Sequence, residues 1–310
     1  MNTGISLIRL FRQVIVFSLI LFLAADSIAA GDIPKDSNTN VPPVVSAAWL
    51  KENLADPRLI LLQVTAIRLD YDNGHLPGAH FLWPGYLMIS TEEETTVPAP
   101  VRDVTRLLRS LGVNNDSRII LCGSQGNIIP VCRVFVNLEH YGLKGRVSIL
   151  DGGLEAWKAA GYEVSKDLPP AGKGSFTASL YKNLADDIFM ADNLTNSSYF
   201  IIDARPESQY EGSAALFRSG HIPGAKNLPQ PDMYNHNTFI FTDAETITES
   251  FRKLRIPPGS RPVLYCNTGN SASVGYVAAI IAGFDPILYD GSMEKWGNRH
   301  DLPVEKKLLP

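Results

Sequence analysis

Three short patterns occur twice in this chain, in the same order and at nearly the same spacing. The letters GHLPGA at residues 74–79 return as GHIPGA at residues 220–225, which is 146 positions later. The letters IILC return as VLYC, and LDGGLEAW at residues 150–157 returns as YDGSMEKW at residues 289–296. Ordered matches at a nearly constant offset predict a duplicated domain of roughly 140 residues.

Each half alternates short apolar runs with helical patterns. In the first half, strands are expected at residues 59–64, 118–121 and 147–150, and helices at residues 101–111 and 131–141. In the second half, strands are expected at residues 199–203, 262–265 and 286–289, and helices at residues 243–254 and 272–282. Alternation of this kind predicts an α/β fold with a parallel sheet covered by helices on both faces. We expect one domain at residues 44–166, a Pro- and Gly-rich linker, and a second domain at residues 175–306.

Composition excludes several classes of protein. The 310 residues carry a net charge of -4 and are 45% hydrophobic, which is ordinary for a globular chain. Without a basic run the chain has no electrostatic footprint for phosphate, so no nucleic-acid partner is expected. Three cysteines are too few for a disulfide scaffold, and none of the six histidines pairs with cysteine at zinc-site spacing. We therefore expect no metal site.

The first 30 residues differ from the rest of the chain. Two arginines precede an apolar run at residues 14–25, and small residues follow, with Ser27 and Ala29 at -3 and -1 of a cleavage site. This pattern predicts a signal peptide at residues 1–30 and a periplasmic or secreted protein. The apolar run has twelve residues, whereas a spanning helix needs about 20. An uncleaved membrane anchor is the alternative.

Cys266 lies in a short loop between a predicted strand and a predicted helix. The strand ends at Tyr265, the helix begins near Ala272, and residues 266–271 read CNTGNS. A loop of small and polar residues at a helix N-terminus can turn its backbone N–H groups inward and bind an anion. Such groups favour the thiolate, the nucleophilic form of cysteine. We expect Cys266 to be a nucleophile, with a buried, inert cysteine as the alternative.

The two HxPGA turns, the DGGLEAW block and the letters DAR at residues 203–205 together resemble the rhodanese family, and within it the two-domain thiosulfate and 3-mercaptopyruvate sulfurtransferases. The resemblance implies tandem rhodanese-like domains, each a five-stranded parallel sheet with helices on both faces, of which the first is non-catalytic. It also implies a reaction without metal or organic cofactor. A sulfane sulfur passes from thiosulfate or 3-mercaptopyruvate to Cys266, as a persulfide, and then to cyanide or a thiol.

The resemblance carries over residue by residue to the loop and to one earlier strand end. Cys266 matches the catalytic cysteine, and Arg205 is placed where a guanidinium would face an anionic donor. An ion pair of Arg205 with Asp203 or Glu211 is the alternative. The expected substrate-binding loop comprises Asn267, Thr268, Gly269, Asn270 and Ser271. This neutral loop lacks both the basic residues of the thiosulfate enzymes and the GSGVT pattern of the mercaptopyruvate enzymes, so the donor stays open.

The other two cysteines lie in the first half. Cys122 is aligned with Cys266 by the IILC and VLYC patterns, and its loop, which runs to Pro130, reads as longer. Cys132 reads as a core residue of the following helix. A second sulfur site at Cys122 and a disulfide between Cys122 and Cys132 are both left open, because an exported protein meets an oxidising compartment.

Two other functions were weighed against a sulfurtransferase. Phosphatases with a similar fold use a Cys-x5-Arg loop, but the sixth residue after Cys266 is Ala272. A phosphate dianion would lack its main clamp, which excludes that class. A non-enzymatic sulfur carrier or thiol sensor would keep a modifiable Cys266 but show negligible turnover, and it remains the alternative function.

Overall fold

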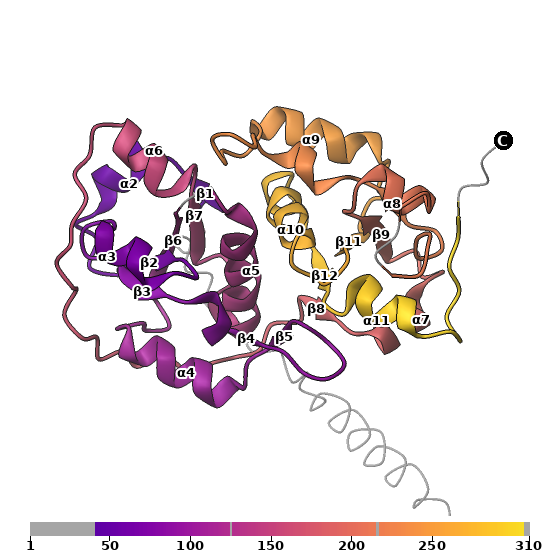
Figure 1. The fold of residues 1–310 in the computed structure, drawn as a ribbon, viewed down its shortest axis with the longest axis horizontal. Helices are drawn as coiled ribbons and strands as arrows, with labels where there is room; N and C mark the ends of the chain where they lie inside the picture. Colours follow the sequence, from indigo (N-terminus) through magenta and orange to yellow (C-terminus); the bar gives the residue numbers. More distant parts are fainter. Residues whose placement is uncertain (1–40, 125, 215–216, 307–310) are drawn as a thin grey trace, which may run out of the picture. The chain divides into compact units, whose positions relative to one another are not determined.

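The computed structural model describes residues 41–124, 126–214 and 217–306. The expected signal peptide, residues 1–30, lies outside the described residues. Within them, no helix is both long and apolar enough to cross a lipid bilayer. Residues 41–306 form two halves that share one topology (Figure 1).

The first half contains a five-stranded sheet in which every pairing is parallel. Its spatial order is β1 (Val44–Val45), β7 (Val147–Leu150), β6 (Arg118–Gly123), β2 (Leu59–Val64) and β3 (His80–Leu82). Its helices are α2 (Ala47–Asn53), α3 (Arg68–Asn73), α4 (Val101–Ser110), α5 (Ile128–Leu138) and α6 (Gly153–Ala159). Helix α5 begins three residues earlier than expected, because Pro130 is tolerated in the first turn, where N–H groups have no intrahelical partner.

The second half repeats this arrangement. Its parallel sheet has the order β10 (Lys226–Asn227), β9 (Tyr199–Asp203), β11 (Arg261–Tyr265), β12 (Ile287–Tyr289) and β8 (Leu184–Ala185). Its helices are α7 (Asp187–Asn193), α8 (Glu207–Glu211), α9 (Ala244–Lys253), α10 (Ala272–Ile281) and α11 (Ser292–Asn298). The predicted α/β class, with two parallel five-stranded sheets, is confirmed.

Alternating side chains of the central strands enter separate cores on the two faces of each sheet. In the first half, α2 and α6 cover one face and α4 and α5 cover the other. In the second half, α7 and α11 cover one face and α9 and α10 cover the other. Helices α5 and α10 share a single apolar cluster, so the inner faces of the two halves form one continuous core (Figure 1).

The duplicated sequence patterns produce duplicated side-chain geometry. The ring of His75 stacks on Tyr71 and that of His221 on Tyr210, each at a centroid distance of 3.9 Å. In both cases the histidine Nδ1 lies within hydrogen-bond distance of that tyrosine's carbonyl oxygen. The HxPGA histidines therefore brace turns, and neither belongs to the loop that carries Cys266.

A buried polar network joins the two halves beside α5 and α10. The Tyr276 hydroxyl donates to Oε2 of Glu139 at 2.8 Å, and the Asn183 side-chain amide donates to the Tyr276 oxygen at 3.1 Å. Burial raises the pKa of the Glu139 carboxyl, which is 3% exposed. A buried carboxyl that loses its donor bears a full desolvation cost, so this contact contributes to the stability of the interface.

We predict that Tyr276→Phe lowers the free energy of unfolding by about 1–3 kcal/mol, because Oε2 of Glu139 then lacks its donor. Urea unfolding followed by circular dichroism measures this change. Tyr86→Phe is the matched control: Tyr86 is 47% exposed, and its loss should matter by less than about 0.5 kcal/mol. Equal stability of the two variants would contradict the network's role.

Candidate active site

Cys266 follows directly after β11, the central strand of the second sheet, and is 1% exposed. Its backbone N–H donates to the Ser292 hydroxyl at 3.1 Å, and its carbonyl accepts from the Met293 N–H at 3.1 Å. Ser292 and Met293 open α11, the repeated DGSMEKW block. The block that is duplicated in sequence therefore holds the cysteine at the carboxyl end of its strand, where ligands of parallel α/β sheets bind.

Every carbonyl of residues 266–271 is hydrogen-bonded. After Cys266, the Asn267 carbonyl accepts from the Glu294 N–H at 2.8 Å, and the Thr268 carbonyl accepts from the Thr96 hydroxyl at 2.6 Å. The carbonyls of the last three loop residues, Gly269, Asn270 and Ser271, accept from the first turn of α10, from the Ser273 hydroxyl, the Ser273 N–H and the Val274 N–H.

The backbone N–H groups of this loop after Cys266, unlike its carbonyl groups, lack partners among the described residues. Among the residues that the structure describes, none accepts a hydrogen bond from the backbone N–H of Asn267, Thr268, Gly269, Asn270 or Ser271. Five successive N–H groups without an acceptor in the described part of the chain, next to the N-terminus of the ten-residue helix α10, are suited to binding an anion. The structure thus brings together all the loop residues expected from the sequence.

Gly269 is required at its position by both conformation and space. Its φ is +73°, in the left-handed region, and a Cβ added there would lie 2.6 Å from the Asp290 carbonyl oxygen. The same Cβ would lie 3.4 Å from Nη1 of Arg133. The loop therefore packs directly against an arginine from the first half.

Arg133 and Asp290 form a buried ion pair that the sequence did not reveal. Arg133 lies on α5 and is 0% exposed; its Nη2 is 2.5 Å from Oδ1 of Asp290, at the end of β12. Within the described residues, Nε and Nη1 of Arg133 have no hydrogen-bond acceptor. Asp290 thus balances a cation held close behind the loop.

Gln209 is the second site residue that the sequence analysis missed. Its Oε1 accepts a hydrogen bond from Nδ2 of Asn267 at 2.9 Å. Gln209 lies on α8, four residues after Arg205, so the DAR pattern that marked Arg205 was the available signal.

The structure places Arg205 in the ion-pair alternative. Its Nε donates to Oδ1 of Asp203 at 2.9 Å, its Nη2 donates to the Gly220 carbonyl at 2.7 Å, and it is 2% exposed. Asp203 also accepts from the Tyr265 hydroxyl at 2.7 Å, which ties the end of β9 to the residue before the cysteine. These contacts give Arg205 a bracing role, and its contact with a donor stays a prediction.

The strand pairings of the two sheets give an alignment of the halves that differs by one residue from the alignment expected from the sequence. Strands β6 and β11 both start with arginine and have leucine as their fourth residue. Cys122 pairs with Gln63 on β2, as Tyr265 pairs with Asp203 on β9. Cys122 therefore corresponds to Tyr265, and the counterpart of Cys266 is Gly123. The expected equivalence of Cys122 and Cys266 is wrong.

This shift points the two cysteines toward opposite faces of their sheets. Cys122 lies in the core beneath α2 and α6, whereas Cys266 lies in the core that contains α10. The first loop is also shorter, with residues 124–127 against residues 267–271, contrary to expectation.

Cys122 and Cys132 lack the features of a sulfur site. Both are 0% exposed, and burial raises the pKa of each thiol. All three cysteines are free in the structure, so the expected alternative of a bridge between Cys122 and Cys132 is not observed. A protonated thiol is a weak nucleophile. All three cysteines are buried, but Cys266 is the one followed by N–H groups that have no acceptor among the described residues, which makes it the reactive candidate.

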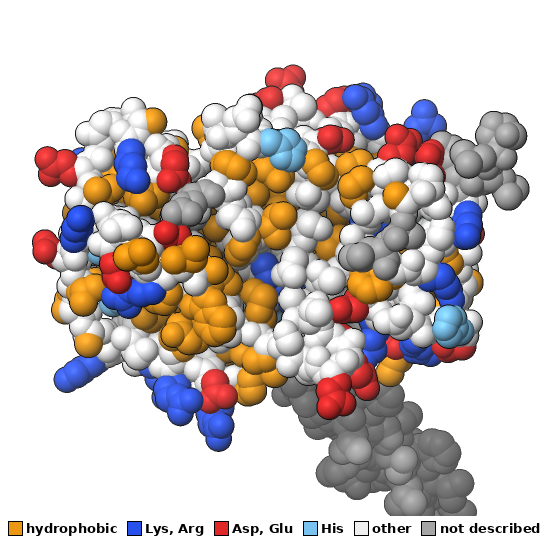
Figure 2. Space-filling model, viewed as in Figure 1, with side chains coloured by type: hydrophobic (Ala, Val, Ile, Leu, Met, Phe, Trp, Pro, Cys, Tyr) orange, Lys and Arg blue, Asp and Glu red, His pale blue; other side chains and the backbone are white. Residues whose placement is uncertain are grey.

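The face of the molecule in Figure 2 shows Lys and Arg side chains interspersed with Asp and Glu. Charges of both signs alternate around its edge, and hydrophobic side chains occupy much of its middle. This face offers no continuous basic track of the kind that binds a nucleic-acid backbone.

The model of the rhodanese-like domain matches this chain twice, at residues 46–160 and at residues 186–299. This chain belongs to the rhodanese family. Each match begins just after the first strand of its sheet and covers the other four strands with their helices, and the second contains the Cys266 loop.

Rhodanese relatives of known name align with most of the chain. A 3-mercaptopyruvate sulfurtransferase of Escherichia coli is 28% identical over 283 residues, covering 84% of this chain and 97% of the relative. A thiosulfate sulfurtransferase of Azotobacter vinelandii is 28% identical over 273 residues, covering 87% and 99%. The sulfur carrier protein TtuD of Thermus thermophilus is 27% identical over 286 residues, covering 85% and 96%.

Solved structures share the architecture. The SseA crystal structure from Escherichia coli, described as a 3-mercaptopyruvate sulfotransferase, superposes with a TM-score of 0.69 at 25% identity, covering 81% of this chain and 99% of that chain. A structure of EanB in complex with ergothioneine superposes with a TM-score of 0.74 at 21% identity, covering 87% and 71%. The second likeness concerns the fold alone.

We predict that Asp290→Asn destabilises the protein by about 3–5 kcal/mol, because Arg133 would remain buried without its counter-charge. Urea unfolding of Asp290→Asn, Arg133→Met and the double variant measures the coupling. The double variant should recover much of the loss, since it removes both buried charges. Additive losses in the double variant would show that the two side chains do not act as a pair.

Proposed function

We propose that this rhodanese is a sulfurtransferase that carries sulfane sulfur on Cys266. The observation that carries the proposal is the run of five backbone N–H groups directly after Cys266, for which the described part of the chain supplies no acceptor. Such a run of donors stabilises an anion, and both a thiolate and a persulfide are anions. Sulfurtransferase relatives that align with both halves of the chain support the same activity.

The first half-reaction forms one bond and breaks one. The Cys266 thiolate attacks the outer sulfur of thiosulfate, the S–S bond of the donor breaks, and its electron pair leaves with sulfite. With 3-mercaptopyruvate the C–S bond breaks instead, and the electron pair leaves with the enolate of pyruvate, which takes up the proton of the donor thiol to become pyruvate. In both cases the product is a Cys266 persulfide, and the N–H groups of residues 267–271 can donate hydrogen bonds to its negatively charged outer sulfur.

The second half-reaction returns the enzyme to its starting state. A nucleophile such as cyanide attacks the outer sulfur of the persulfide, the S–S bond breaks, and the electron pair returns to Cys266. The products with cyanide are thiocyanate and the thiolate. Both steps are displacements at sulfur and involve no metal or organic cofactor.

The loop also bears on which donor is used. The side chains of residues 267–271 are neutral, and the nearby cation Arg133 is paired with Asp290. Backbone donors alone should hold the doubly charged thiosulfate less firmly than a basic loop would. We expect a high KM for thiosulfate in consequence.

A sulfur carrier is the second candidate function, favoured by one observation. TtuD, which aligns with 85% of this chain, is named a sulfur carrier protein. A carrier would load Cys266 in the same way but pass the sulfur to a protein thiol. Rapid thiocyanate release supports the enzyme, and a stable Cys266 persulfide with negligible turnover supports the carrier.

We predict that thiosulfate or 3-mercaptopyruvate adds one sulfur atom to the protein, that cyanide removes it, and that Cys266→Ala abolishes the gain. Intact mass spectrometry before and after cyanide measures all three. Cys122→Ala is the matched control and should load like the wild-type protein, because Cys122 lies in the opposite core. A sulfur retained in Cys266→Ala and lost in Cys122→Ala would overturn the assignment.

We further propose that the chain is exported and acts in the periplasm or outside the cell, on the basis of residues 1–30. When the full-length chain is expressed, cell fractionation should recover the protein outside the cytoplasm with a new N-terminus after Ala29 or Ala30. A chain lacking residues 2–29 should stay in the cytoplasm. An intact N-terminus in the membrane fraction would instead indicate an uncleaved anchor.

A further inference from the structure

Each half extends an equivalent hairpin that contacts the other half. In the first half, η1 (Pro84–Tyr86) leads into the antiparallel pair β4 (Met88–Ile89) and β5 (Val97–Pro98). In the second half, η3 (Gln230–Met233) leads into a hairpin closed by the bridge between Tyr234 and Phe241. We call these the crossing hairpins, residues 88–98 and 234–241, because the tip of each contacts the other half.

An equivalent hydrogen bond closes each crossing hairpin, and these two bonds align the sequences of the hairpins. The Ala99 N–H donates to the Leu87 carbonyl at 3.1 Å, and the Thr242 N–H donates to the Met233 carbonyl at 2.9 Å. The positions three residues before each donor are Thr96 and Phe239, 143 residues apart. The same offset separates Gly123 from Cys266. Thr96 and Phe239 are therefore counterparts.

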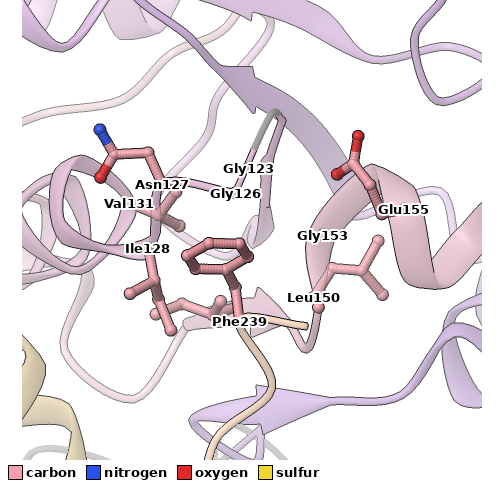
Figure 3. A pocket seen from close by; sticks show the side chains of 11 residues that line it. Gly123, Gly126, Asn127, Ile128, Val131, Leu150, Gly153, Glu155 and Phe239 are labelled. Carbon is pink, nitrogen blue, oxygen red and sulfur yellow. The ribbon is translucent and has the colours of Figure 1, made fainter. Parts of the chain in front are cut away.

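Phe239 fills the first-half position that corresponds to the active site. Its ring lies among Gly126, Ile128 and Gly153, where the first-half loop meets α5 and α6 (Figure 3). A Cβ added to Gly126 would lie 2.2 Å from Cε2 of Phe239, so the ring packs directly on the glycine that corresponds to Gly269. About 20 Å³ of space remains, which is room for about one water molecule.

Thr96 contacts the Cys266 loop through a hydrogen bond. It is 7% exposed, and its hydroxyl donates to the Thr268 carbonyl at 2.6 Å. Because a trans peptide is planar, a carbonyl held on one side turns the N–H of the next residue, Gly269, to the opposite side. Among the described residues, Thr96 is the one first-half donor to the carbonyls of residues 266–271.

We infer that Thr96 is a positioning residue for sulfur transfer: from the first half, it orients the Thr268–Gly269 peptide so that the Gly269 N–H faces the anion. The inference rests on the proposed function, and it gives the first half a direct part in the chemistry of the second.

Three substitutions separate these roles. Thr96→Val keeps the shape of the side chain but removes its hydroxyl donor, and Thr96→Ser keeps the hydroxyl. Thr96→Phe introduces the side chain of the counterpart, Phe239. Thr105→Val is the matched control, because the Thr105 hydroxyl also donates to a carbonyl, that of Val101, at 2.7 Å, but on α4. Circular dichroism confirms the fold of each variant.

We expect Thr96→Val to lower the rate of single-turnover persulfide formation by about tenfold, as expected when an anion donor is misdirected rather than deleted. The midpoint of the pH profile of Cys266 alkylation by iodoacetamide should shift upward, since the thiolate loses one oriented N–H. Thr96→Ser and Thr105→Val should both keep the wild-type rate of persulfide formation and the wild-type midpoint of the alkylation profile. Thr96→Phe should lower the rate at least as much as Thr96→Val, because it also removes the hydroxyl donor.

Alkylation reports the loop without any sulfur donor, so the two proposals can fail separately. A wild-type protein that takes up no sulfur would overturn the proposed function. A wild-type protein that is active, together with Thr96→Val that matches it in both rate and pH midpoint, would overturn the role of Thr96. If Thr96→Phe does not fold, the comparison of the valine and serine variants decides.

Discussion

The geometry of the Cys266 loop, residues 266–271, depends on how its carbonyl groups and its N–H groups are hydrogen-bonded. All six carbonyls of residues 266–271 are hydrogen-bonded, while none of the N–H groups of residues 267–271 has an acceptor among the described residues. A planar peptide points its two polar groups in opposite directions, so fixing the carbonyls fixes the donors. The sheet, α10, α11 and the first-half hairpin each supply part of this restraint.

The two loops of the duplicated fold differ at a few contacts. Gly123 stands where the second half has Cys266, so the first loop has no nucleophile. The neighbouring Cys122 faces the other side of the sheet, in a core that raises the pKa of its thiol. Phe239 then occupies the space beside the silent loop. The first half still contacts the second half through Arg133, Glu139 and Thr96, which bind Asp290, Tyr276 and the Thr268 carbonyl.

The fold was predictable from sequence because its signals are local. Apolar runs and helical periodicity placed the central strands, and the repeats marked the duplication. The Cys266 loop could be found for the same reason, since strand, small polar residues and helix follow one another in the chain. The one-residue error at Cys122 came from aligning the two cysteines. The arginine and leucine shared by RIILCG and RPVLYC were the better guide.

Arg133 and Thr96 could not be found this way. Each lies more than 130 residues before the loop that it contacts, and nothing in its neighbouring residues specifies a partner in the other half. Only the packing of α5 against α10 and the crossing of the hairpins bring them to the loop. Arg205 shows the reverse case: its sequence context suggested donor binding, but the nearby Asp203 carboxylate and Gly220 carbonyl engage its guanidinium.

A crystal structure of the thiosulfate-loaded protein would test the central claim most directly. The account predicts additional density for one sulfur atom on Sγ of Cys266, with the outer sulfur within hydrogen-bond distance of several N–H groups of residues 267–271. It also predicts that the Thr96 hydroxyl still donates to the Thr268 carbonyl. Sulfur on Cys122, or a Cys266 persulfide that points away from these N–H groups, would contradict the account.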